Sequence, residues 1–186
     1  MSLLLYVVVF FLFTGSYILN ITALILPKWL KFIVQDPEHY SETIYGLFQR
    51  CESSTGECTS FPQPDDCKED FCQLWQIVVA GVILATFIGT MTMIGLIGAI
   101  FSPRDKRDQG WKLIAGSLIL FLAIPLVVSF SAVVYLSNTN SSIFHLGTSF
   151  DQSFIMSAIS WCLSVILACI MMGFSTSSHD YYHRFE

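Results

Sequence analysis

The chain has 186 residues, of which 54% are hydrophobic and 12% are charged, and its formal net charge is −5. A soluble globular domain carries about 25% charged residues, so this composition excludes an ordinary water-soluble domain and favours a membrane protein. The acidic balance also excludes a typical nucleic-acid-binding protein, whose affinity rests on lysines and arginines that meet phosphates.

The first predicted element is a membrane-spanning helix over residues 3–26. A helix needs about 20 consecutive apolar residues to cross the hydrocarbon core of a bilayer, and this segment carries no charged side chain. A cleaved signal peptide is the alternative, but its apolar core would be only about 7–15 residues long and would follow a basic segment. The run ends at Pro27-Lys28-Trp29, which is typical of a helix stop at a membrane interface. We therefore expect the segment to be retained as a span.

A long polar loop, residues 27–73, follows the first span. Between Lys28 and Gln73 it holds nine acidic and four basic residues, which gives it a formal charge of −5. Four of the six cysteines lie here, and an even number of cysteines outside the cytosol indicates disulfides. Four cysteines allow three connectivities, and the sequence does not choose among them. A zinc site is the alternative, but it requires thiolates in a reducing compartment. The four are Cys51, Cys58, Cys67 and Cys72.

Within this loop, a short β-hairpin is predicted. Residues 40–48 mix aromatic and β-branched side chains, and Gly56 lies between Cys51 and Cys58. This pattern is typical of a hairpin closed by a disulfide.

Three further apolar segments predict membrane spans at residues 74–101, 113–136 and 150–174. The second and third carry no charged side chain, and the fourth has only Asp151 at its rim. Pro125 lies in the middle of the third span, where a proline can kink or unwind the helix.

The lysines and arginines predict the orientation of these spans. The connector at residues 102–112 is densely basic, whereas the later loop at residues 137–149 has no lysine or arginine. Cytosolic loops are enriched in these residues, so we expect the connector, both termini and the tail at residues 175–186 to be cytosolic. We expect the plasma membrane as the location, with another membrane of the secretory pathway as the alternative. The basic residues of the connector are Arg104, Lys106, Arg107 and Lys112.

Small and polar residues recur at intervals of four in three of the spans. Small side chains let helices approach closely in lipid, and a membrane asparagine seeks a hydrogen bond from another helix. We interpret these stripes as bundle packing rather than a substrate path, because transport sites generally need ionisable groups at membrane depth. The stripes are Ser16 and Asn20 in the first span, Gly81, Ala85 and Gly89 in the second, and Ser160, Ser164 and Ala168 in the fourth.

Other candidate sites are weak. Asn140 begins a glycosylation sequon close to the end of the third span. His179 and His183 have the spacing of a helical metal site, but a solvated tail is the preferred interpretation. No pattern of nucleophile and base appears, so we expect neither an enzyme nor a cofactor or metal ion.

The ordered set Trp29, Gly46-Leu47-Phe48, Cys51 and Cys58 resembles the W–GLW–C–C signature of the claudin/PMP22-like superfamily of four-span proteins. Gln49-Arg50 separate the triplet from the first cysteine, as in that signature. The chain departs from it in having Phe48 in place of the second tryptophan and two additional cysteines. Fungal cell-cortex tetraspans and channel-modulating γ-subunits share a related pattern.

The resemblance implies an all-α transmembrane four-helix bundle that carries a small, disulfide-pinned, β-rich domain on its extracellular side. It also implies that Trp29 packs with Leu47 and Phe48 to seat a sheet on the bundle; the alternative makes Trp29 an ordinary interfacial aromatic. We further expect Cys51 to be bonded to Cys58, and Cys67 to Cys72.

Two functions are compatible with this architecture. The first is lateral or cell–cell protein association, as in adhesion, barrier formation or membrane organisation. The second is that of an auxiliary subunit of a channel, receptor or other membrane complex. In both cases the expected partners are membrane lipids and other membrane proteins, without nucleic acid.

Overall fold

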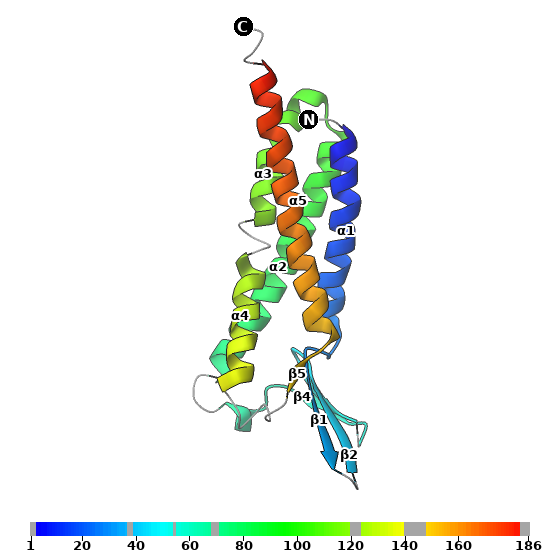
Figure 1. The fold of residues 1–186 in the computed structure, drawn as a ribbon, viewed down its shortest axis with the longest axis vertical. Coiled ribbons are helices and arrows are strands. Elements are labelled where there is room, and N and C mark those ends of the chain that lie inside the picture. The colour runs from blue at the N-terminus through cyan, green and yellow to red at the C-terminus, as the bar shows by residue number, and fades with distance from the viewer. Residues whose placement is uncertain are drawn as a thin grey trace.

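The computed structural model describes residues 3–36, 39–53, 55–67, 71–119, 124–139 and 148–182. Most of these residues are helical, and the helices gather into an elongated bundle with a small sheet at one end (Figure 1). The first residues of α1 and the last of α5 lie at the opposite end of the bundle. The helices are α1 (Leu3–Ile25), α2 (Phe71–Phe101), α3 (Arg104–Gly116), α4 (Ile124–Thr139) and α5 (Gln152–Tyr182).

Three helical segments are long and apolar enough to cross a membrane: α1, α2 and residues Gln152–Gly173 of α5. Their outward faces carry large exposed apolar side chains, such as Phe11, which is 68% exposed, and Phe87, which is 59% exposed. Faces of this kind are unfavourable in water and favourable against hydrocarbon. The chain is therefore a helical membrane protein by the length and composition of its helices.

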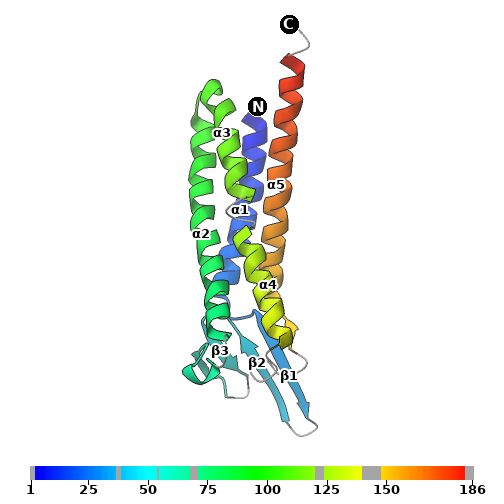
Figure 2. The same ribbon diagram turned by 90° about the vertical axis from the view of Figure 1, so that its left-hand side faces the viewer.

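Within the third predicted span, 113–136, the structure describes two helical segments. The helix α3 ends at Gly116 and is followed by a π-helical turn over residues 117–119, and α4 begins at Ile124. Pro125 lies in the first turn of α4, where proline is tolerated because its missing N–H would have no partner within the helix. Figure 2 shows α3 and α4 one above the other, alongside α2 and α5. Residues 120–123 lie outside the described residues.

Other boundaries also differ from the prediction. The expected connector at 102–112 is largely the first part of α3, and α2 begins at Phe71, three residues before the predicted start. The helix α5 continues to Tyr182, so most of the predicted tail has a helical backbone, while His183 lies outside the described residues.

The sheet has five strands in the order β4-β3-β2-β1-β5. The four strands of the first loop pair antiparallel in succession, β1 with β2, β2 with β3 and β3 with β4, and β5 pairs with β1 at Leu30 and Lys31. The sequence predicted a hairpin in the first loop; β5 shows that Ser149 of the second predicted loop joins the sheet as well. The strands are β1 (Leu30–Asp36), β2 (His39–Tyr45), β3 (Gln49–Glu52), β4 (Cys58–Ser60) and β5 (Ser149–Phe150), and a 3-10 turn follows β4 at Pro64–Asp66.

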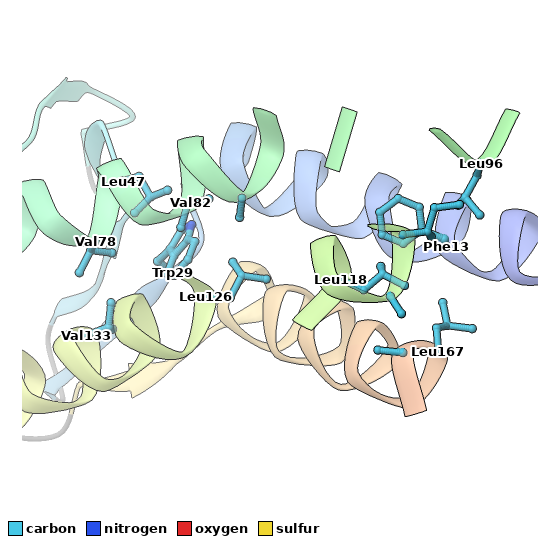
Figure 3. Close-up of a cluster of buried hydrophobic side chains, with 14 of the residues drawn as sticks. Phe13, Trp29, Leu47, Val78, Val82, Leu96, Leu118, Leu126, Val133 and Leu167 are labelled. Carbon is cyan, nitrogen blue, oxygen red and sulfur yellow. The ribbon is translucent and has the colours of Figure 1, made fainter. Parts of the chain in front are cut away.

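One continuous apolar core runs from the bundle into the base of the sheet. Figure 3 shows Trp29 and Leu47 at the sheet end of this core and Phe13 and Leu96 towards the other end. Because the core crosses from helices to strands, the sheet is packed on the bundle and is not merely tethered to it.

Candidate functional site at the junction of sheet and helices

Trp29 joins α1, the sheet and α5. Its side chain is fully buried, its indole Nε1 donates to the carbonyl oxygen of Ala23 at 2.8 Å, and its ring meets that of Phe154 edge-on at 6.2 Å. Its backbone N–H donates to the carbonyl oxygen of Tyr45 at 2.9 Å, and its own carbonyl accepts from Asp151 at 3.1 Å. Burial and these four partners favour the anchoring role over that of an ordinary interfacial aromatic.

Gly46 allows the turn after β2 to lie directly on the segment that follows α1. A Cβ atom added to Gly46 would lie 2.5 Å from the Cα of Pro27 and 3.1 Å from the carbonyl oxygen of Gln49. A backbone atom cannot move aside as a flexible side chain can, so this position requires glycine.

Leu47 and Phe48, the two residues after Gly46, differ in burial. Leu47 is buried and its carbonyl oxygen accepts a hydrogen bond from the indole Nε1 of Trp75 at 3.0 Å. Phe48, in contrast, is 48% exposed, so the expectation that it is buried with Trp29 is wrong. The tertiary contacts of the turn account for this difference: Leu47 lies against Trp75, and Phe48 remains at the surface of the junction.

An aromatic cluster that the sequence analysis did not single out completes the junction. The ring of Phe61 lies 5.1 Å from that of Trp75 and 5.5 Å from that of Tyr45, and Phe71 stacks on Trp75 at 5.9 Å. Phe61, Phe71 and Trp75 are buried. A weak signal for Phe71 and Trp75 was available, because they lie four residues apart at the start of an apolar helix and so share one face.

Arg50, the basic residue of the expected signature, lies directly opposite Tyr45 in the β2–β3 ladder, with its guanidinium carbon 5.5 Å from the ring centroid. Burial raises the pKa of the Tyr45 phenol above its usual value of 10.0, and the positive charge of Arg50 opposes that shift. Arg50 also lines a polar hollow of 260 Å³ together with Glu52 and Glu57. Arg50 therefore packs on a ring of the neighbouring strand and borders the polar surface of the sheet.

Two disulfides close the sheet and its return to the bundle. Cys51 is bonded to Cys58, directly opposite it in the β3–β4 ladder, and Cys67 is bonded to Cys72 in the first turn of α2. This is the expected connectivity, and it leaves none of the four thiols for a zinc site. Gly56, with φ of 70°, supplies the left-handed residue in the turn of the β3–β4 hairpin.

The predicted polar stripe of α1 makes contacts with two helices. Ser16 Oγ lies 3.0 Å from Ser160 Oγ of α5, and its hydroxyl donates to the Ser160 carbonyl oxygen at 2.9 Å. Asn20 Nδ2 donates to Thr86 Oγ1 of α2 at 3.0 Å, the interhelical hydrogen bond that was predicted for a membrane asparagine. Ser164 and Ala168 of α5 are also buried.

The stripe on α2 packs against α4. Ala85 and Gly89 are buried, and at Gly81 the two helices touch most closely: an added Cβ would collide with Ser129 Oγ and lie 3.0 Å from the carbonyl oxygen of Pro125. Gly81, the first residue of the predicted stripe, thus allows α4 to approach α2.

Replacing Gly81 with alanine is expected to destabilise the α2–α4 contact by about 1–3 kcal/mol, because the new methyl group has no space. The measurement is thermal unfolding in detergent micelles. Adding Ser129→Ala removes the Oγ atom that would collide. The double variant should therefore lose less stability than the sum of the losses in the two single variants. If the stability losses of the two single variants simply add in the double variant, the close approach of Gly81 and Ser129 is contradicted.

Asn140, the predicted glycosylation site, lies outside the described residues.

Comparison of the chain with models of protein families and with curated proteins found no match. The class of protein therefore rests on the fold itself: a helical membrane protein whose bundle carries a small sheet and two disulfides.

Proposed function

We propose that the chain is a claudin-like four-span membrane protein that acts by lateral or cell–cell association with other membrane proteins through its sheet. The observation that carries this proposal is the way in which the sheet is held: strands, α1, α2 and α5 share one core, and all three residues of the edge strand β4 are exposed. An exposed edge strand can pair with a strand of another chain.

The distribution of charge supports the same proposal. The spans α1, α2 and residues 152–173 of α5 carry no charged residue, whereas the sheet end carries the acidic loop and the polar hollow beside Arg50. Polar recognition is therefore concentrated on the sheet, and the bundle supports it.

The proposed orientation has the sheet outside the cell. The basic stretch Arg104–Lys112 forms the start of α3, at the end of the bundle away from the sheet, and the first residues of α1 and the last of α5 lie at that same end. The positive-inside rule places that end in the cytosol. A tag after Glu186 should bind antibody only in permeabilised cells, while a tag in the turn at residues 53–56 should bind in intact cells. Antibody binding to the Glu186 tag in intact cells would overturn the orientation.

The functional test uses two cell populations that express the chain with different fluorescent tags after Glu186. Association between cells predicts enrichment of both colours at contacts between the populations, and lateral association predicts oligomers of the 20.9 kDa chain in mild detergent. The matched control is the chain with Cys51→Ser and Cys58→Ser, which retains the bundle but loosens the β3–β4 hairpin. A single copy bound stoichiometrically to a channel or receptor, without self-association, would instead establish the auxiliary-subunit role.

A further inference from the structure

The turn between α2 and α3 and the first part of α3 form a basic stretch, residues 102–112. Its formal charge is +2, from four basic and two acidic residues, whereas the charge of the whole chain is −5. Two apolar side chains that are mostly exposed flank the stretch, Phe101 at 85% and Leu113 at 79%. Side chains of this kind are favourable against hydrocarbon, which indicates that the boundary of the hydrocarbon core lies close to both. The charged residues are Arg104, Asp105, Lys106, Arg107, Asp108 and Lys112.

Contacts between α2 and α3 give the depth of this stretch. The two helices run antiparallel side by side (Figure 2), and Thr92 Oγ1 of α2 lies 3.0 Å from Ser117 Oγ. Phe101 follows Thr92 by nine residues, so it lies level with Asp108, which precedes the contact on α3 by the same number. At 1.5 Å per residue, residues 104–107 then lie within about 6 Å beyond Phe101. The headgroup layer on each side of the hydrocarbon core is about 5–8 Å thick, so these residues lie at the depth of lipid headgroups.

Two of the basic residues have no acidic neighbour on their face of the helix. Asp108 lies four residues from both Arg104 and Lys112, a spacing at which the side chains of a helix meet. Lys106 and Arg107 have no acidic residue three or four positions away, so no helical neighbour offsets their charge. They also lie in the first turn of α3, where the helix dipole makes a cation unfavourable. The helix itself therefore gains no stability from these two charges.

Trp111 and Lys112 mark the membrane boundary on α3. Trp111 is half-buried, and Nζ of the exposed Lys112 lies 5.9 Å from the centre of its ring. Tryptophan and lysine are the usual anchors of a span at the level of the headgroups. Lys106 and Arg107 lie more than one turn closer to the start of the helix. The helix thus carries an anchor at the boundary and, beyond it, positive charge that its own acidic residues do not offset.

We infer that the start of α3 binds the headgroups of anionic phospholipids in the leaflet beside it. Lys106 and Arg107 attract headgroups with a net negative charge, such as that of phosphatidylserine, more strongly than the neutral headgroup of phosphatidylcholine. The inference rests on the membrane insertion that is part of the proposed function. With the proposed orientation the leaflet is the cytosolic one, whose negative surface attracts basic segments next to a span.

The test reconstitutes the full chain in phosphatidylcholine vesicles in which a minor fraction of the lipid is phosphatidylserine. Bromine atoms near the glycerol end of the acyl chains are placed on one of the two lipids at a time, and they quench an indole ring that they contact. The signal of Trp111 is the difference between the natural chain and Trp111→Phe. Each net positive charge favours an anionic lipid about fivefold, so phosphatidylserine should quench Trp111 about 5- to 25-fold more strongly per molecule than phosphatidylcholine. Salt at about 1 M should lower this preference, because it screens the charges.

A pair of charge variants isolates the surface. Lys106→Gln with Arg107→Gln removes two positive charges at the start of α3 and should reduce the preference to about twofold or less. Lys28→Gln with Lys31→Gln removes the same charge at the sheet end of the bundle and should leave the preference at Trp111 unchanged. A preference that persists in the first variant, or that falls equally in the second, would overturn the inference.

A variant with added net charge separates binding from misfolding. Asp105→Asn with Asp108→Asn leaves every basic residue in place and should raise the preference about fivefold or more. Misfolding can abolish a binding surface but does not strengthen it. If the preference does not rise in this variant while its circular dichroism spectrum matches that of the natural chain, the inference is overturned.

The outcomes distinguish this inference from the proposed function. Quenching of Trp111 that is equal for the two lipids would overturn the headgroup surface and leave the membrane insertion, and with it the proposed function, intact. If neither lipid quenches Trp111, this end of the bundle does not lie at a bilayer surface, and both proposals fail. Both leaflets of the vesicles contain both lipids, so the measurement does not depend on the orientation of the chain.

Discussion

Replacing Trp29 with alanine is expected to destabilise the junction of sheet and bundle by about 3–5 kcal/mol, the usual cost of removing a large buried aromatic side chain. The side chain is fully buried and meets residues from α1 and α5, so neither element can close the cavity without moving away from the other. The loss combines the missing contacts of the ring with an unsatisfied carbonyl at Ala23.

Limited proteolysis measures this loss. Trypsin cleavage at Arg50 in the sheet reports the population of opened junction when opening is fast relative to cleavage, so Trp29→Ala should speed cleavage by about 100-fold or more. Trp29→Phe retains most of the buried area but leaves the Ala23 carbonyl without its donor, so it should cost about 1–3 kcal/mol, less than Trp29→Ala.

Phe48→Ala is the matched control, because it also truncates an aromatic ring at the junction. Its ring is 48% exposed, and its removal is expected to cost about 1 kcal/mol or less. If Trp29→Ala and the natural chain resist the protease equally, Trp29 acts only as an ordinary interfacial aromatic. If Phe48→Ala loses as much stability as Trp29→Ala, the contrast between a buried Trp29 and an exposed Phe48 is contradicted.

The sequence predicted the features that depend only on residues close together in the chain. An uninterrupted apolar run of more than 20 residues suffices for α1 and α2, and small residues at intervals of four on α2 suffice to predict a helix-packing face, on which Gly81 meets α4. The partner of Asn20 was predictable as a class, a polar group on another helix, because an amide in lipid has few alternatives.

Tertiary context determined the rest. The burial of Leu47 and the exposure of Phe48 depend on which side of the turn faces Trp75, and Trp75 lies 28 residues away in the chain. The pairing of β5 with β1 joins segments more than 100 residues apart, and a strand of two residues has no periodicity to detect. The aromatic cluster at the junction likewise joins Tyr45, Phe61 and Trp75 from three separate segments, so it could not be read from any one motif.

Replacing Cys51 and Cys58 together with serine is expected to destabilise the β3–β4 hairpin by about 2–4 kcal/mol. The bond joins two residues separated by seven positions, on strands of only four and three residues. Strands this short contribute few ladder hydrogen bonds, so the hairpin depends strongly on a covalent link that restricts its unfolded state.

Hydrogen exchange in lipid nanodiscs measures this effect on individual strands. The amides of β3 and β4 should exchange about 30–1,000 times faster in the double serine variant, while those of α1 and α2 should keep their rates. The double variant Cys162→Ser and Cys169→Ser removes two thiols that are exposed and free on α5, and it should leave the hairpin unchanged. Removing the other bond, through Cys67→Ser and Cys72→Ser, should instead speed exchange in the first turns of α2, because that disulfide ties the returning chain to the helix. If the β3 and β4 amides exchange at the natural rate without the Cys51–Cys58 bond, the sheet is held by its aromatic junction alone.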